Sequence, residues 1–441
     1  MTMKTAYLAL FAVLGGTALA APATLPAPLT DADFLPVDPA EAALGQLLFY
    51  DPILSGRRDV ACATCHHPRF GTADGLSLGL GDGGTGLGPD RVADPDNLPE
   101  ERVPRNAPAL FNLGVKNLTV LFHDGRISVD PTRPGGIRTP LETDMTAGFA
   151  SLLSAQTMFP VLSPDEMAGH YAESDVSRAV RQGILTGPGG AWDIIARRVA
   201  AIPTYAQMFR DVYPAIQSPD DIAFTDISNA IAAFMELEWR SDDAPFDAVL
   251  RGEGTLPEPA ATGMELFYGR AGCGTCHSGP LLTDQSYHAM GVPQIGPGKK
   301  ARFEHGARDE GRAEVTGKPE DLFAFRTPSL RNVALTGPYG HAGSHATLTG
   351  LITDHADPVA ALARYDAGQA VLPLLSVADD GIMSDPAEVA ALAASVKTPP
   401  VALSEADVAA LVAFLDSLTD PAAVKGVLGV PTAVPSGLPV P

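Results

Sequence analysis

The sequence is short of positive charge, cysteine and tryptophan, and each shortage excludes a class of protein. It holds 30 Lys and Arg against 52 Asp and Glu, a net charge of −22, which repels nucleic acids and anionic membrane surfaces. We therefore expect no nucleic-acid partner. Four cysteines in 441 residues are too few for a disulfide scaffold. Beyond the N-terminal segment no apolar run reaches the roughly 20 residues of a spanning helix, so we also expect no membrane span.

The composition is that of a globular chain with many loops. At 45% hydrophobic and 19% charged residues it can bury large cores, while 44 Gly and 40 Pro indicate long ordered loops. Alternating strand patterns are scarce, and the clear periodicity is helical. It predicts one helix with an apolar face at Ile227, Ala230, Ile231 and Phe234, and a closing helix after the capping box Ser404-Glu405-Ala406-Asp407. We therefore expect an all-α, loop-rich fold.

The first twenty residues have the pattern of an export signal. Lys4 supplies a positive start, residues 6–14 an apolar stretch, and Ala18-Leu19-Ala20 a small-residue cleavage site. The apolar stretch is too short to be a membrane anchor. We expect residues 1–20 to be a signal peptide cleaved after Ala20, and the mature protein to be exported to a bacterial periplasm.

All four cysteines fall into two copies of one motif, Cys62-Ala63-Thr64-Cys65-His66 and Cys273-Gly274-Thr275-Cys276-His277. This is the attachment signal for c-type haem, in which both cysteines bind the haem covalently and the histidine becomes an axial ligand of the iron. A redox-active cysteine pair or half of a zinc site would need no histidine directly after the motif, and no other cysteine completes a four-cysteine zinc site. The sequence therefore predicts two covalently bound haem c groups, with His66 and His277 as iron ligands.

The two motifs indicate two domains. Their histidines stand 211 residues apart, too far for one small cytochrome fold. Similar segments, Leu47-Leu48-Phe49-Tyr50 and Leu266-Phe267-Tyr268-Gly269, precede them, as an internal duplication would give. We expect a cytochrome c-like domain at 21–244, a second at 245–425 and a terminal tail at 426–441, with a linker over 242–261.

Further motifs make the chain resemble the bacterial di-haem cytochrome c peroxidases and the related MauG-type enzymes, from about Ala43 to Asp420. The resemblance is carried by residues 47–55, 105–108, 123–126, 325–332 and 335–341. It implies that peroxide reacts at the N-terminal haem and that the C-terminal haem relays electrons. One iron then needs an open coordination position, and the other is best six-coordinate.

The resemblance also implies a set of side chains over the reactive haem. The family places a Gln there, a Pro four residues later and a Glu ten residues later, and Gln156, Pro160 and Glu166 have this spacing. A carboxylate beside bound peroxide can carry a proton from one oxygen to the other, which makes Glu166 the catalytic candidate. The local pattern Ser163-Pro164-Asp165-Glu166 also reads as a helix start in which Glu166 closes a capping box.

Two departures from the family pattern stand out. Peroxidases that require reductive activation carry a loop histidine after the first haem motif, whereas residues 71–105 contain none. His67 is beside the axial ligand, so we expect it at the surface or near a haem propionate. The family has a tryptophan between the haems where this chain has His123. His123 either bridges the haems by hydrogen bonds or is a structural histidine.

The resemblance implies two further metal-ligating sets. The second axial ligand of the C-terminal haem stands fourteen residues after His341, which is His355. A surface role for His355 is the alternative, with Tyr365 and then Met383 as other ligand candidates. The family also holds a calcium ion with one Asn side chain and two carbonyl oxygens, and Asn106, Thr336 and Pro338 match those positions. Such an oxygen-only site suits calcium.

Three functions remain open. The first is a periplasmic peroxidase that reduces hydrogen peroxide with electrons from a small cytochrome c or cupredoxin. The second is a MauG-like enzyme that oxidises a residue of a partner protein. The absence of the loop histidine and of a Met ligand favours this second function. The third is a non-catalytic di-haem electron carrier. A homodimer is compatible with all three.

Overall fold

The computed structural model describes residues 24–145, 147–299 and 306–441, and the predicted signal peptide lies outside them. The described chain is rich in helix. The α-helices are α1 (Pro39–Tyr50), α2 (Cys62–Cys65), α3 (Leu152–Thr157), α4 (Asp175–Gln182), α5 (Ala191–Ala200), α6 (Pro203–Val212), α7 (Phe224–Glu238), α8 (Pro245–Leu250), α9 (Ala260–Tyr268), α10 (Ala313–Thr316), α11 (Leu348–Ala356), α12 (Pro358–Leu362), α13 (Pro386–Ser395), α14 (Glu405–Asp416) and α15 (Pro421–Lys425). Among these helices none is long and apolar enough to cross a membrane.

The strands are short and form three small antiparallel sheets within the described chain. They are β1 (Gly84–Thr85), β2 (Val92–Ala93), β3 (Val120–Leu121), β4 (Ile127–Val129), β5 (Ile137–Arg138), β6 (Tyr287–His288) and β7 (Phe325–Arg326). β1 pairs with β2, β3–β4–β5 form a meander, and β6 pairs with β7. Each strand is two or three residues long, and β3 and β4 add Leu121 and Ile127 to the N-terminal core. The helices predominate, which agrees with the predicted helical, loop-rich fold.

The N-terminal core is built on a close crossing of α1 and α7. Gly45 makes the crossing possible, because a Cβ atom there would overlap the Ala230 carbonyl oxygen. Phe49 packs on Phe234 with ring centroids 5.2 Å apart. α7 is the helix predicted from the apolar face at 227–234. Buried residues between Leu44 and Trp239 make up this core, together with Ala423 and Val434 from the C-terminal end.

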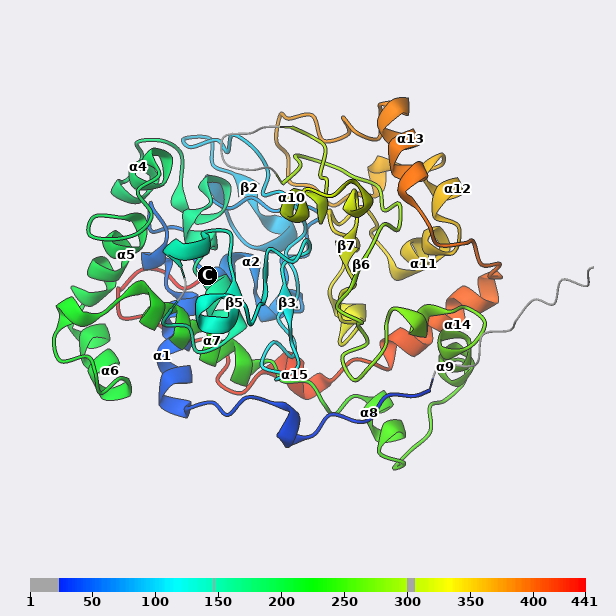
Figure 1. The fold of residues 1–441 in the computed structure, drawn as a ribbon, viewed down its shortest axis with the longest axis horizontal. Coiled ribbons are helices and arrows are strands. Elements are labelled where there is room, and N and C mark those ends of the chain that lie inside the picture. Colours follow the sequence, from blue (N-terminus) through cyan, green and yellow to red (C-terminus); the bar gives the residue numbers. More distant parts are fainter. Residues whose placement is uncertain (1–23, 146, 300–305) are drawn as a thin grey trace, which may run out of the picture.

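The C-terminal core repeats the same crossing with α9 and α14. A Cβ atom at Gly263 would overlap the Ala410 carbonyl oxygen, and Phe267 packs on Phe414 at 5.1 Å. Ser404 caps α14 as predicted, since its hydroxyl accepts from the Asp407 amide and the Asp407 carboxylate accepts from the Ser404 amide. The core residues run from Phe246 to Leu418. The same Gly–Phe–Tyr spacing on α1 and α9 therefore gives the two halves the same helical framework (Figure 1).

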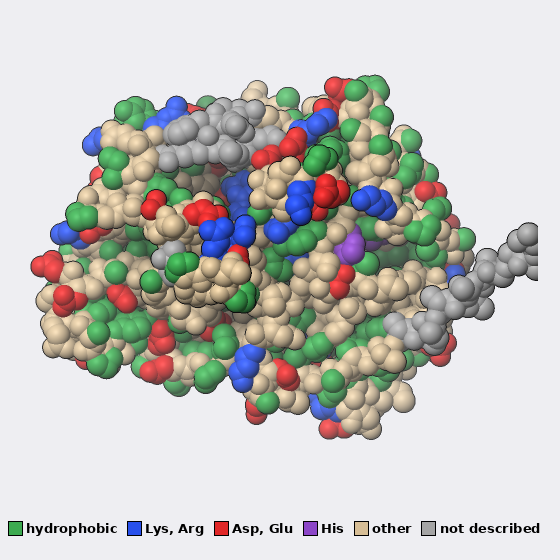
Figure 2. All heavy atoms as spheres, viewed as in Figure 1, with side chains coloured by type: hydrophobic (Ala, Val, Ile, Leu, Met, Phe, Trp, Pro, Cys, Tyr) green, Lys and Arg blue, Asp and Glu red, His purple; other side chains and the backbone are tan. Residues whose placement is uncertain are grey.

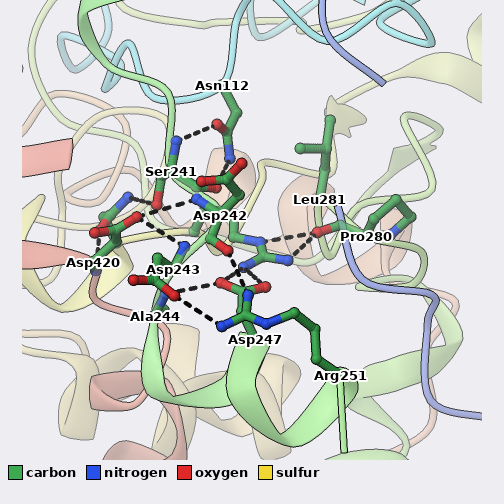
Figure 3. Close-up of polar contacts among 12 residues, drawn as sticks. Asn112, Ser241, Asp242, Asp243, Ala244, Asp247, Arg251, Pro280, Leu281 and Asp420 are labelled. Atoms are coloured by element: carbon green, nitrogen blue, oxygen red, sulfur yellow. Dashed lines mark hydrogen bonds and ion pairs between the residues drawn. The ribbon is translucent and has the colours of Figure 1, made fainter. Parts of the chain in front are cut away.

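The segment between the halves is fixed by buried polar contacts rather than flexible. The Asn112 side-chain amide pairs with both backbone groups of Ser241, and the Asp420 carboxylate accepts from the amides of Asp242 and Asp243 (Figure 3). Asp247, on α8, forms a fully buried ion pair with Arg331 at 2.6 Å. The expected linker over 242–261 thus contains a helix and belongs to the packed structure.

The final residues correct the expectation of a tail. The Glu238 carboxylate accepts hydrogen bonds from the amides of Val427, Leu428 and Gly429. Ser436 donates to Asp51 at 2.7 Å, and Val434 is buried in the N-terminal core. Figure 1 shows this segment in red, returning from α15 to lie beside α1 and α7. Residues 426–441 therefore act as a strap from the C-terminal half onto the N-terminal half, where Val434 is buried and Leu438 and Val440 pack against the core.

The long loop after the first haem motif is also held by both halves. Leu76, Leu78 and Leu80 are buried, and Leu78 packs with Ile295 and Ala342 of the C-terminal half. The Arg91 guanidinium donates to three carbonyls of the loop, those of Leu80, Gly81 and Gly86. Few apolar anchors were visible in this Gly- and Asp-rich stretch, yet its leucines fix it in place.

Candidate functional site: two histidine-centred sites joined by an interface

The first motif presents His66 for metal binding. α2 carries Cys62 and Cys65, both free thiols, and ends at His66. The His66 Nδ1 atom lies 3.0 Å from the Thr72 carbonyl oxygen, so Nδ1 carries the proton and Nε2 keeps its lone pair. Burial lowers the pKa of His66, although the Thr72 carbonyl and the Glu166 carboxylate oppose that shift. The imidazole is thus neutral and oriented as an iron ligand.

The second motif repeats this arrangement. Cys273 and Cys276 are free thiols around a 3-10 turn, Cys273–Thr275. The His277 Nδ1 atom lies 3.1 Å from the Leu282 carbonyl oxygen, which again leaves Nε2 as the ligand atom. Burial lowers the pKa of His277 as well. Since no cysteine forms a disulfide, the four thiols are available for covalent attachment.

A cavity of about 410 Å³ lies over His277, and His355 lines it from another element. The cavity face of α11 consists of Leu348, Leu351, Ile352 and His355, which follow the helical spacing of one apolar stripe. Burial, with His277 and His345 nearby, lowers the pKa of His355 to about 4. Two neutral imidazoles that line one cavity suit a six-coordinate haem.

Contacts next to His355 fix how α11 lies. The Asp354 carboxylate bonds to His345 Nε2 at 2.9 Å and to the Arg364 guanidinium at 2.8 Å. The two other ligand candidates lie outside the cavity lining. Tyr365 donates to the Ser344 carbonyl at 2.9 Å, and Met383 packs in the cluster around Phe323 and Leu392. Of the three candidates the structure brings only His355 to the cavity of His277.

The three residues predicted over the first haem lie on consecutive short turns. Gln156 is on α3, Pro160 begins a 3-10 turn (Pro160–Leu162), and Glu166 is on a single π turn (Pro164–Ala168). The Gln156 Oε1 atom is buried without a hydrogen-bond partner. Glu166 does not close a capping box: the Ser163 side chain caps nothing, and Glu166 Oε1 lies 3.5 Å from Lys299 Nζ. Glu166 is therefore free of the capping role that its sequence pattern suggested.

Sequence reasoning missed three polar residues around the first site. Lys299 comes from the C-terminal half, 133 residues after Glu166, so no local pattern could pair them. Asp74 and Arg91 lie near Cys65, together with Glu166, and act on the pKa of its thiol. Burial raises the pKa of Asp74 to about 7. Acidic residues in a Gly-rich loop normally indicate a solvated turn. The sequence pattern therefore did not identify Asp74 as a residue of the site.

A charged and aromatic cluster joins the halves beside the cavity. His123 and His341 both line the cavity, and the His341 ring stacks on Phe325 with centroids 3.8 Å apart. Both nitrogens of His341 are buried without a partner. Burial, with Arg105 and Arg326 nearby, lowers the pKa of His123 to about 3. Arg105 itself bonds to Asp309 at 2.7 Å and to Asp124 at 2.6 Å, which fixes the interface.

The three residues predicted for calcium also meet at this interface. Asn106, Thr336 and Pro338 line the same cavity, although they come from both halves. The Asn106 Nδ2 group donates to the Leu76 carbonyl at 2.7 Å, which leaves Oδ1 as the atom that could hold a cation. One amide oxygen beside two carbonyl-bearing residues is an oxygen donor set of the kind that calcium prefers.

In each half two free thiols beside an oriented histidine fit a covalently attached haem, and the C-terminal cavity adds a second histidine, His355. Comparison with known proteins agrees with this geometry. The model of the di-haem cytochrome c peroxidase family matches residues 39–255. The methylamine utilization protein MauG of Methylorubrum extorquens is 30% identical over 391 residues, which cover 88% of this chain and 81% of that protein. The cytochrome c551 peroxidase of Nitrosomonas europaea is 29% identical, with 70% of each chain covered.

Another relative and two solved structures extend the comparison. The cytochrome c peroxidase Ccp of Escherichia coli is 32% identical over 72% of this chain and 53% of its own length. A crystal structure of a MauG-like protein associated with microbial copper homeostasis superposes with a TM-score of 0.58 at 26% identity, covering 93% of this chain and 97% of that one. The diheme peroxidase BthA of Burkholderia thailandensis has the same TM-score of 0.58 at 22% identity, covering 91% and 90%, which shows a shared fold.

Proposed function

This chain belongs to the di-haem cytochrome c peroxidase family, and on that premise we propose that it reduces hydrogen peroxide to water with electrons from a small cytochrome c or cupredoxin. Electrons enter at the C-terminal half and pass to the N-terminal half, where peroxide reacts. The expected signal at residues 1–20 supports a periplasmic location. The relatives named cytochrome c peroxidase share peroxide as the oxidant.

One difference between the halves carries this proposal. In the C-terminal half His355 and His277 line one cavity, so that site offers two imidazoles. In the N-terminal half the loop over 71–105 has no histidine, and polar Gln156 and Glu166 occupy the segment predicted to face the haem. When bound, a haem with an open position supplies the iron at which peroxide coordinates and its O–O bond is cleaved. This asymmetry supports the proposal that the C-terminal half transfers electrons and the N-terminal half reacts with peroxide.

The residues of the first site then have separate roles. Glu166 takes a proton from one peroxide oxygen and returns it to the other. The ammonium group of Lys299, 3.5 Å away, holds the carboxylate in its place. The unpartnered Oε1 of Gln156 accepts a hydrogen bond from peroxide or from water. Pro160 begins the turn that sets the spacing between them.

The interface has a proposed role of its own. His123 and His341 line the cavity at the interface of the two halves. His123 stands where the family has tryptophan, and we place it, together with His341, on the inter-haem route. Calcium, held by Asn106, Thr336 and Pro338, would fix the same region. The role of the two histidines is supported by their position beside the cavity. The calcium site is supported by the oxygen donor atoms that its three residues offer.

The test is rapid mixing of the oxidised di-haem protein with hydrogen peroxide, with and without reduced cytochrome c. We expect fast peroxide consumption that continues only while reduced donor is present, with two donor molecules oxidised for each peroxide. A protein that leaves peroxide intact under both conditions is not a peroxidase.

A second function is favoured by one observation. The loop over 71–105 lacks the activating histidine and is anchored to the C-terminal half, and MauG matches 88% of this chain. These features suit a MauG-like enzyme that oxidises a residue of a partner protein. That function predicts that small electron donors do not speed peroxide turnover, whereas a partner protein does and gains a changed mass.

A further inference from the structure

One arginine of the C-terminal cavity has no carboxylate partner among the described residues. Arg326, on β7, lines the cavity over His277 and is half-buried. Its Nε atom donates to the Phe122 carbonyl at 3.1 Å, and Nη1 donates to the Thr327 carbonyl at 3.4 Å. Nη2 donates to no atom of the described chain. The two N–H bonds of Nη2 are therefore left for an acceptor that the protein itself does not supply.

The other arginine that lines this cavity shows what a buried guanidinium normally needs. Arg331 is buried and pairs with Asp247 at 2.6 Å. Arg105, at the interface of the two halves, pairs with two carboxylates. Burial lowers the pKa of Arg326, and no carboxylate of the described chain opposes that shift. A buried cation without a counter-ion is unfavourable, so we expect an anion beside Arg326.

Positive charge gathers where the two halves meet, although the net charge of the chain is −22. Figure 2 shows Lys and Arg side chains close together over the region where β3, α10 and β7 are labelled in Figure 1. Arg312, which directly precedes α10, donates to the backbone carbonyls of Asp124 and Gly125 rather than to a carboxylate. The local field therefore attracts an anion to this junction.

The haem itself can supply this anion. A haem attached at Cys273 and Cys276 brings two propionate carboxylates into the cavity that Arg326 lines. We propose that Arg326 binds one of these propionates through Nη2. The Phe122 carbonyl holds Nε, and the Arg326 amide donates to the His123 carbonyl at 2.7 Å, so the N-terminal half fixes this arginine at two points. Arg326 is then a positioning residue that links the C-terminal haem to the other half.

The two halves differ at this position. The backbone carbonyls of Pro108 and Pro328 each act to raise the pKa of the axial histidine in their own half. Asn106 stands two residues before the first proline, and Arg326 stands two residues before the second. Asn106 is neutral, and its Nδ2 group donates to the Leu76 carbonyl. The structural repeat thus has a cation at this position in the C-terminal half and a neutral side chain in the N-terminal half.

The ion pair affects the reduction potential of the C-terminal haem. A positive charge beside the haem favours the reduced iron, because reduction lowers the positive charge of the iron by one. Arg326 also neutralises a propionate that would otherwise favour the oxidised iron. The ion pair therefore raises the potential of this haem. The inference rests on haem attachment and not on peroxide as the substrate, so it goes beyond the proposed function.

The first test is a spectroelectrochemical titration of the di-haem protein and its variants. Arg326→Gln removes the charge and keeps a polar side chain, so the equilibrium constant for reduction of the C-terminal haem should fall by at least about tenfold, or about 59 mV for a one-electron couple. Arg326→Lys keeps the charge and should recover most of that loss. Arg312→Gln, at the same junction but outside the cavity lining, is the matched control and should change the constant by less than about twofold. Equal losses in Arg326→Gln and Arg312→Gln would overturn the proposal.

The second test is a crystal structure of the unaltered di-haem protein, which decides the matter even if Arg326→Gln does not fold. We expect Nη2 of Arg326 at about 3 Å from a propionate oxygen of the C-terminal haem. Propionates that bond only to other groups would overturn the proposal. If the protein consumes no peroxide, the proposed function fails, while the crystal structure and the potential of Arg326→Gln still decide the role of Arg326.

Discussion

The Ser77 hydroxyl of the N-terminal half donates to the Gly343 carbonyl of the C-terminal half at 2.6 Å. The same hydroxyl accepts from the Val371 amide at 2.9 Å, and the Ser77 amide donates to the Val371 carbonyl at 2.8 Å. Three hydrogen bonds thus tie the loop over the first site to the other half. On the proposed function, we expect a loop held in this way, which has no histidine to offer as a ligand, to leave the first site open in every oxidation state.

The first prediction follows from this anchored loop. The fully oxidised protein should react with peroxide as fast, within about twofold, as a sample first reduced by one electron. Stopped-flow absorbance of both samples makes the comparison. A resting oxidised protein that becomes reactive only after reduction would show that the loop moves despite its bonds.

The second prediction concerns His355. His355→Ala should convert the iron of the C-terminal half from a low-spin to a high-spin form, because it removes the proposed second ligand and neither Tyr365 nor Met383 lines the cavity to replace it. Tyr365→Phe and Met383→Leu are the matched controls, since both side chains lie outside the cavity lining, and their spectra should match that of the unaltered protein. A spectrum that changes in Tyr365→Phe instead would move the ligand to Tyr365.

The third prediction concerns Glu166. Glu166→Gln keeps the size and the hydrogen bonds of the side chain but loses the base, so the reaction with peroxide should slow by ~10²-fold or more. Asp165→Asn, one residue away on the same turn, is the control and should retain most of the rate. Near-normal kinetics in a folded Glu166→Gln protein would leave Gln156 as the remaining polar candidate.

The fourth prediction is a pH dependence of stability. Burial raises the pKa of Glu236 from 4.5 to about 7, although Ser151 donates a hydrogen bond to its carboxylate. Between these values the folded protein holds a proton that the unfolded chain has lost, so the free energy of unfolding falls as pH rises through this range. Glu236→Gln should remove the contribution of this group to the fall, which is on the order of 2–3 kcal/mol. Urea unfolding at pH 5 and pH 8 measures it, and parallel pH profiles for the two proteins would contradict it.

The fifth prediction concerns the helix crossings. Gly45→Ala places a methyl group against the Ala230 carbonyl oxygen and should destabilise the N-terminal half by about 3 kcal/mol. Gly254→Ala, where the new methyl group meets only the Ala248 side chain at 3.7 Å, is the control. Thermal unfolding of the Gly45→Ala and Gly254→Ala proteins measures the difference in stability. Equal unfolding midpoints would mean that α1 and α7 can move apart at little cost in free energy.

The sequence was informative wherever function depends on residues close together in the chain. Each attachment motif is five consecutive residues, so its chemistry could be read directly. Helices α7 and α14 have regular apolar stripes, and α14 also has the cap at Ser404, so both helices could be predicted. His355 was reached by counting from His341 on the family pattern, and the structure places it on the cavity face of α11.

What the sequence could not show depends on distant contacts. The capping pattern at Ser163–Glu166 is locally convincing, yet Glu166 instead meets Lys299 from the other half. Residues 426–441 have the Pro- and Gly-rich composition of a loose tail, but Glu238 binds three of their amides. The sequence does not distinguish Arg326 from the other arginines, and only the fold shows that it lines the cavity without a carboxylate partner in the described chain.

The most direct test of the central claim, that one half is open for peroxide and the other is closed by two histidines, is electron paramagnetic resonance of the fully oxidised protein before and after addition of peroxide. The account predicts two ferric signals of equal intensity, one high-spin and one low-spin with two imidazole ligands, and a loss of the high-spin signal on mixing. Two low-spin signals that peroxide leaves unchanged would contradict it.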